Sequence, residues 1–71
     1  MVPEWQQRVI DEASDLEAKL EKLNDFLAKP VEVMEGSPAD KHRSLLVLQA
    51  AQMAAYAHTL RERMGLFAEL V

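Results

Sequence analysis

Lys-Pro-Val-Glu-Val-Met-Glu-Gly-Ser-Pro-Ala-Asp, residues 29–40, is the stretch that decides the fold of this 71-residue chain. Its first part ends a helix, because the residue before Pro30 is pushed out of the α region. Its second part begins another helix: Ser37 is a good N-cap, Pro38 suits the first helical position, and Asp40 follows three residues after the cap, as in a capping box. The stretch therefore predicts a loop over residues 29–36 between two helices.

Residues 3–28 carry the pattern of an amphipathic helix. Pro3 suits the first turn, where its missing N–H costs nothing. Apolar residues then recur at alternating steps of four and three and form one stripe. The stripe consists of Trp5, Val9, Ala13, Leu16, Leu20, Leu23 and Leu27, with Ile10 and Phe26 beside it. The other side is mostly charged, so one face of this helix is expected to pack against a neighbour.

The second helix is expected over about residues 38–69, because no proline or glycine follows Pro38 until Gly65. It has two apolar stripes, of which the first helix can cover one. The stripe expected to face the first helix is Leu46, Gln49, Met53, Tyr56, Leu60, Met64 and Phe67. The other consists of Val47, Ala50, Ala51, Ala54 and Ala57, with Leu45 and Leu48 beside it.

The surplus apolar stripe predicts a homo-oligomer, since an alanine-rich face allows helices to approach closely. The expected interface is Leu45, Val47, Leu48, Gln49, Ala51 and Ala54. Gln49 would set the register there, as buried polar residues do in coiled coils. The alternative is that these alanines are good helix formers on a solvated face.

Length and composition agree with an all-α antiparallel hairpin, one domain over residues 1–71, assembled into a helical bundle. A core of this size is small, and the chain has no cysteine, which leaves oligomerisation as its expected support. The net charge is −4 and neither predicted helix has a basic face, so duplex nucleic acid is not an expected partner. No segment has the length of a membrane span or the pattern of a leader, and we expect a cytoplasmic protein.

One end of the hairpin is the candidate ligand site. In a hairpin that turns near residues 30–36, facing residue numbers should sum to about 66. Trp5 and Arg8 would then lie beside Tyr56 and Arg63, with His58, Leu60 and Arg61 close by. Aromatic rings stack on bases and guanidinium groups hold phosphates, which favours a nucleotide site. The alternative is ordinary packing, with edge aromatics and arginines neutralised by nearby carboxylates.

Lys19 and Lys22 lie along one side of the first helix, where they could meet a phosphate across an interface, although solvated lysines are commoner. No enzyme signature is present. His42 and His58 are not at ligand spacing, and there is no phosphate-cradling glycine loop or activated nucleophile. The sequence therefore predicts a protein without catalysis, metal or cofactor.

The run Trp5-Gln6-Gln7-Arg8-Val9-Ile10-Asp11-Glu12, followed by Leu16, Lys19, Lys22-Leu23 and Phe26, resembles short bacteriophage proteins of the crAss-phage-related type. The second helix agrees through its Leu45-Leu46, Gln49, Met53, Tyr56, Leu60 and Arg63 pattern. The resemblance covers both helices and departs in the loop from Pro30 to Gly36. The resemblance implies a phage origin and a helical hairpin. The members of that family are mostly of unknown function.

By analogy, small phage proteins of this shape serve in counter-defence, and some trap the nucleotide signals of bacterial immunity between their copies. The first hypothesis is therefore a sponge for a cyclic oligonucleotide or a cyclic ADP-ribose. Trp5 or Tyr56 would stack a base, Arg8 and Arg63 would hold phosphate, and Lys19 or Lys22 of a neighbouring chain would assist. The alternatives are an acidic inhibitor of a host defence complex, similar to an anti-CRISPR, and a structural oligomerisation module without a ligand.

Overall fold

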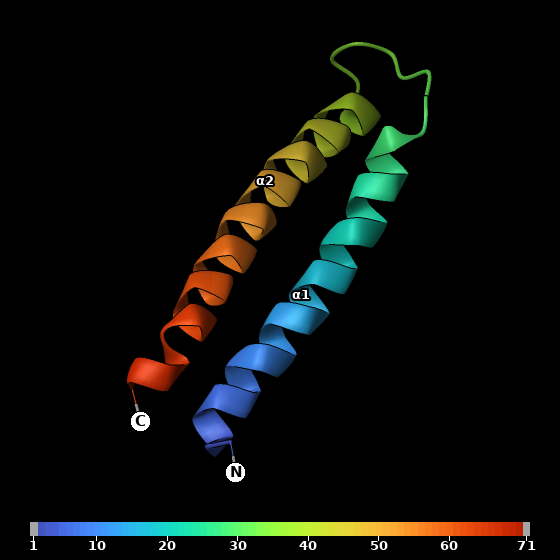
Figure 1. Ribbon diagram of the computed structural model, residues 1–71. Coiled ribbons are helices and arrows are strands. Elements are labelled where there is room, and N and C mark those ends of the chain that lie inside the picture. The colour runs from blue at the N-terminus through green and yellow to red at the C-terminus, as the bar shows by residue number, and fades with distance from the viewer. Residues whose placement is uncertain (1, 71) are drawn as a thin grey trace.

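The computed structural model describes residues 2–70 as two antiparallel helices, α1 (Glu4–Ala28) and α2 (Pro38–Gly65), followed by a short 3-10 helix, η1 (Phe67–Glu69). The molecule is a rod of 53 × 15 × 15 Å with its loop at one end and both termini at the other (Figure 1). The predicted all-α hairpin is confirmed. Neither helix among the described residues is long and apolar enough to cross a membrane.

The helix end and the helix start expected from the sequence are present on the two sides of the loop. α1 ends at Ala28, and Lys29 is extended ahead of Pro30. At the start of α2, Ser37 Oγ accepts a hydrogen bond from the Asp40 amide at 3.2 Å. Asp40 Oδ2 in turn accepts one from the amide of Gly36 at 2.9 Å, and Gly36 turns the chain with a φ of 78°. These local bonds fix where α2 begins.

α2 ends earlier than the predicted limit near residue 69. The Leu66 amide bonds to the Arg63 carbonyl three residues back, so the helix tightens into η1 after Gly65. Glycine has a low helix propensity, which makes it a natural place for this change. The tighter turn carries Phe67 toward the start of α1.

Each helix buries one seam of residues that alternate in steps of three and four, the pattern of knobs-into-holes packing. In α1 the seam is Gln6, Val9, Ala13, Leu16, Leu20, Leu23 and Leu27. In α2 it is Arg43, Leu46, Ala50, Met53, Ala57, Leu60 and Met64. The best-buried part lies toward the termini, where Val9, Ala13 and Leu60 form one cluster and Leu60 is 0% exposed.

Three residues expected on the buried stripes lie outside them. Ala50 and Ala57 face α1, whereas Gln49 and Tyr56 are exposed at an edge of the hairpin. In α1 the buried position is Gln6, and Trp5 is 44% exposed. Small side chains let the helix backbones approach closely, and large rings do not fit in such a seam. The prediction that Gln49 and Tyr56 pack against the first helix was therefore wrong.

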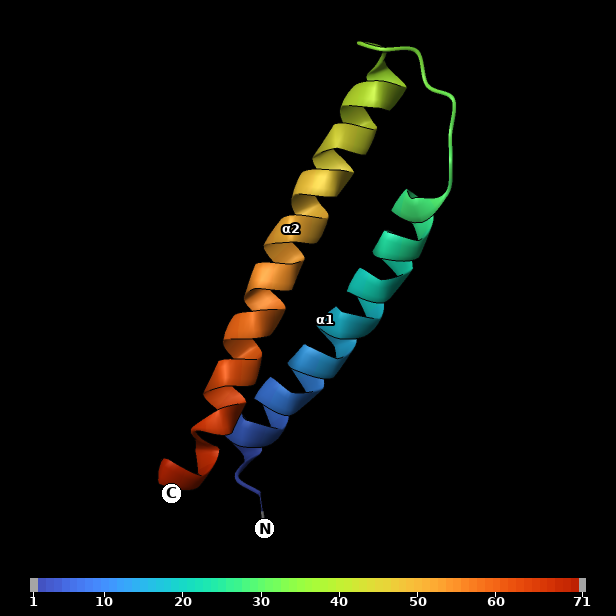
Figure 2. The same cartoon turned by 45° about the horizontal axis from the view of Figure 1, so that its top comes forward.

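The register of the hairpin also differs from the expected one. Ring contacts join Trp5 to Phe67, and the Arg43 guanidinium reaches the Leu27 carbonyl, so facing residue numbers sum to about 70 in place of about 66. The cause is the loop, which continues past the end of α1 and climbs beside the first turns of α2 before it joins that helix (Figure 2).

Arg43 closes the loop end of the seam. Its Nη2 donates to the carbonyl oxygens of Leu27 at 2.6 Å and Lys29 at 3.2 Å, which satisfies carbonyls that the end of α1 leaves unpaired. An apolar pocket of about 180 Å³ lies next to it, lined by Phe26, Val31, Val33, Ala39, His42, Arg43 and Leu46. The loop end is therefore more loosely packed than the cluster around Leu60.

We expect Leu60→Ala to lower the free energy of unfolding by about 2–5 kcal/mol, because it opens a cavity in the best-buried part of the seam. Leu70→Ala is the matched control, since Leu70 is 60% exposed and its removal should cost under about 0.5 kcal/mol. Urea denaturation followed by circular dichroism measures both. Equal effects of the two substitutions would contradict the core described above.

Candidate functional site

The hairpin has two long edges, and one of them collects most of the predicted ligand residues. We call it the Tyr56 edge: Trp5, Arg8, Glu12 and Lys19 of α1, and Gln49, Tyr56 and Arg63 of α2. Residues three, four or seven apart lie on the same side of a helix, which places each set in one line. The Tyr56 hydroxyl donates to Glu12 Oε1, and this contact joins the two lines across the seam.

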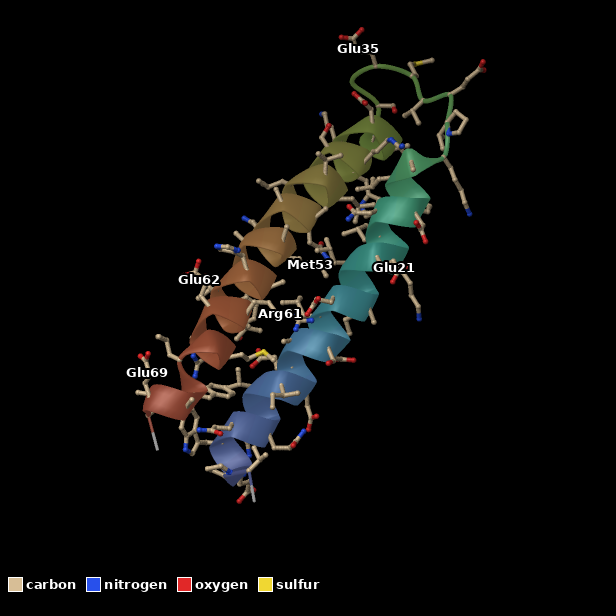
Figure 3. All side chains as sticks on the ribbon, in the orientation of Figure 1. Glu21, Glu35, Met53, Arg61, Glu62 and Glu69 are labelled. Atoms are coloured by element: carbon tan, nitrogen blue, oxygen red, sulfur yellow. The ribbon has the colours of Figure 1, made fainter. Side chains whose placement is uncertain are left out.

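The other edge is defined by the contact of Arg61 with Glu17. Arg61 Nη2 lies 2.8 Å from Glu17 Oε2 and 2.5 Å from Oε1, and Figure 3 shows Arg61 directed from α2 toward α1. His58 lies on the same side of α2 and pairs with Glu62 at 2.9 Å. The expectation that Arg61 and His58 join Trp5 and Tyr56 in one cluster was therefore wrong, because the helix turns them to the opposite edge.

Trp5 forms its own contact at the open end. Its ring meets that of Phe67 edge-to-face, with centroids 5.3 Å apart and planes at 76°. Tyr56 lies about three helical turns from Phe67, roughly 16 Å along α2. Trp5 and Tyr56 consequently mark two separate places on the edge and do not form the single aromatic cluster expected from the sequence.

The cations of the Tyr56 edge differ in their partners. Arg8 pairs with Glu4 at 2.6 Å, and Lys19 pairs with Asp15 at 3.1 Å, both within α1 and both highly exposed. Within residues 2–70, Arg63 has no carboxylate at ion-pair distance. Arg63 is therefore the cation of this edge that is most available to an added anion.

Lys22 is exposed and likewise forms no ion pair with another described residue. Its position in the helical repeat places it further round α1 than Lys19, away from α2. A phosphate bound between Tyr56 and Arg63 would be out of its reach. Lys22 can act only on a ligand that another molecule presents to that side of α1.

Glu12 changes the pKa of the Tyr56 hydroxyl. The hydrogen bond to the Glu12 carboxylate raises the pKa of the Tyr56 hydroxyl, and partial desolvation and the negative charge of Glu12 add to the rise. The positive charge of Arg63, two helical turns further along the same edge of α2, opposes it. Tyr56 is thus a neutral hydrogen-bond donor at physiological pH, held in place by Glu12.

Two polar seam residues were not identified from the sequence. Gln6 is 6% exposed, and its Nε2 has no acceptor among the described residues. Arg43 holds the loop end, as described above. Both residues continue the three-and-four spacing of the seam, in Gln6-Val9-Ala13 and Arg43-Leu46-Ala50. This spacing was the sequence signal that could have identified them as buried. Polar side chains at such positions are easily assigned to a solvated face.

The described residues contain no group of three His, Asp or Glu side chains arranged to hold a metal ion.

Comparison with known proteins found one family. The family model described as Sequestin matches residues 3–66, which includes both helices and the loop between them. No curated protein and no solved structure matches the chain.

Tyr56 is the one tyrosine of the chain, so tyrosinate absorbance reports its titration alone. We expect a midpoint above 10.0, and Glu12→Ala should bring it back toward 10.0. Asp11→Ala removes a neighbouring carboxylate that bonds to Gln7 instead, and should leave the midpoint unchanged. Because the pKa is raised on folding, the stabilisation from this bond is complete below the pKa of an unfolded tyrosine and disappears as pH rises through the folded value. The same midpoint in Glu12→Ala as in the parent chain would contradict this contact.

Proposed function

The chain belongs to the Sequestin family, and on that premise we propose that it sequesters a small nucleotide-type immune signal by binding it without catalysis. The proposal includes a phage origin, action in the cytoplasm of the host cell, and counter-defence as the biological role. The observation that carries it is the family match over residues 3–66, since the family is named for sequestration. The chemistry of the Tyr56 edge supports the nucleotide as the class of ligand.

In this proposal the Tyr56 edge holds a nucleotide at two points. The exposed Trp5 ring stacks a base at the open end, where Phe67 supports it from the side. Arg63 holds a phosphate with its guanidinium fork. The Tyr56 hydroxyl can donate its one hydrogen bond to the ligand only where the ligand displaces the Glu12 carboxylate from it. Arg63 lies about one helical turn from Phe67, a separation that suits a base and a phosphate of the same nucleotide.

Arg8 and Lys19 can join this site at little cost. Their ion pairs with Glu4 and Asp15 are exposed, and such surface pairs contribute only about 0–1 kcal/mol. A phosphate carries more charge and offers better geometry than these carboxylates, so it can replace them. The overall charge of −4 does not oppose this binding, because the contacts are short-ranged and salt screens the more distant acidic groups.

Sequestration requires a ligand to be enclosed, and one edge of a two-helix rod is too open for that. Tight small-molecule sites bury about 70–90% of the ligand surface. A second copy of the chain can supply the missing wall from its exposed apolar face. Self-association is therefore part of the proposed function.

Isothermal titration calorimetry with cyclic dinucleotides, cyclic trinucleotides and cyclic ADP-ribose isomers tests the proposal. We expect at least one of these ligands to bind, and Arg63→Ala to weaken it by about tenfold or more, since a charge-assisted contact contributes about 1.5–3 kcal/mol. Arg63→Lys should restore only part of the affinity, because lysine lacks the planar fork. Lys29→Ala in the loop is the control with the same change of charge.

A second readout comes from Trp5, the one tryptophan of the chain. A base stacked on its ring should quench its fluorescence, and the quenching should follow the same binding curve as the heat. If the folded protein gives no heat with any ligand of the panel, the nucleotide proposal is refuted.

The acidic-inhibitor alternative is less well supported by the geometry. Its four acidic residues do not form one free surface, because Asp11, Asp15 and Glu17 contact Gln7, Lys19 and Arg61, and Glu17 lies on the opposite edge. Charge reversal at Asp11, Asp15, Glu17 and Glu21 should abolish counter-defence if this alternative holds. A purely structural module would instead keep its activity in Arg8→Ala and Arg63→Ala.

A further inference from the structure

α2 has a second seam that faces away from α1. We call it the outer seam: Lys41, Leu45, Leu48, Gln52, Ala55, Thr59, Glu62 and Leu66. Its steps alternate between four and three, like those of the buried seam, and each member is exposed. Leu45 is 63% exposed, Leu48 54% and Leu66 50%. Figure 3 shows Glu62 directed outward from α2 on the side opposite α1.

The outer seam is complementary to itself when it is read in reverse. Around Gln52 as the centre, Leu48 stands opposite Ala55, Leu45 opposite Thr59, and Lys41 opposite Glu62. Each pair combines a large side chain with a smaller one or a cation with an anion. A parallel arrangement would place each residue against its own copy, with Lys41 against Lys41 and Glu62 against Glu62, which like charges disfavour.

We propose that two copies of the chain pair antiparallel along their outer seams, with a twofold axis at Gln52, and form a layer of four helices in which the two α2 helices lie in the middle. This inference rests on the self-association contained in the proposed function and gives it a specific geometry. A twofold contact must be self-complementary, and the reversed pairing satisfies that condition at each seam position from Lys41 to Glu62. At the axis, the two Gln52 amides can each donate to the other.

The charges at the two ends of the pairing set its direction. Glu62 contacts His58 within its own helix at 2.9 Å, but both side chains are highly exposed, so Lys41 of the other copy can join them. The four polar members of the seam limit the apolar area. We therefore expect association that depends on protein concentration, with direction and register chosen by the Lys41 and Glu62 contacts.

This geometry revises the interface expected from the sequence and connects it to the ligand site. Leu45 and Leu48 belong to the outer seam, and Gln49 and Ala51 border it, whereas Val47 and Ala54 lie toward the Arg61 edge. Tyr56 and Arg63 continue the line of Gln49. The second copy would therefore run directly beside the Tyr56 edge and supply the wall that a single hairpin lacks.

Cysteine crosslinking tests the direction and register, because the chain has no cysteine of its own. Gln52→Cys should form disulfide dimers under mild oxidation, since the two residues meet at the axis. Thr59→Cys alone should not, because antiparallel pairing places its two copies roughly 20 Å apart. An equimolar mixture of Leu45→Cys and Thr59→Cys should give the mixed dimer. Dimers of Thr59→Cys that form as readily as those of Gln52→Cys would overturn the proposal.

Charge exchange gives a test without crosslinks. Lys41→Glu and Glu62→Lys should each weaken the dimer in sedimentation equilibrium, and the double variant should restore it, because the pair is only inverted. Failure of this rescue would overturn the register.

The outcomes separate this inference from the function itself. Nucleotide binding in calorimetry without Gln52→Cys dimers would leave sequestration standing and refute the outer-seam pairing. Gln52→Cys dimers without nucleotide binding would refute nucleotide sequestration and leave the outer-seam pairing standing.

Discussion

The close approach of α1 and α2 around Leu60 is the constraint on which the rest of this structure depends. Ala13, Ala50 and Ala57 keep the seam narrow, and Leu60 is completely buried in it. Because packed interiors tolerate little void or overlap, a narrow seam excludes the largest side chains. Trp5 and Tyr56 therefore lie at the edges, where their rings keep an exposed face and their polar atoms keep access to partners.

That exclusion places Tyr56 on the surface at which we propose that a ligand binds. The same rotation of α2 that buries Ala57 turns Tyr56 toward Glu12 and sends Arg61 to the opposite edge. Arg63 then lies on the same edge as a phenol whose pKa is raised by its hydrogen bond to Glu12. A hairpin with tyrosine in its seam would have a larger core but would lack this donor at its surface.

The small size of the fold explains why a second copy enters the proposed function. Two helices of this length bury only one stripe each, and the loop end remains loosely packed around Phe26 and Val31. Apolar residues left over on α2, such as Leu45 and Leu48, are exposed and have the spacing of a face that packs against another helix. Self-association would cover them and would also enclose a ligand at the Tyr56 edge.

The sequence by itself determined the two helices, the loop and the start of α2 at Ser37, because these depend on contacts within a few residues: Lys29 before Pro30, and Asp40 beside Ser37. The choice of Trp5, Arg8, Tyr56 and Arg63 also followed from residue chemistry. Only the tertiary structure decided that Ala50 and Ala57, and not Gln49 and Tyr56, face α1. It also decided the register and the separation of Arg61 from Tyr56. These features depend on how side-chain sizes fit between two helices and on the path of the loop, and neighbouring residues along the chain do not encode them.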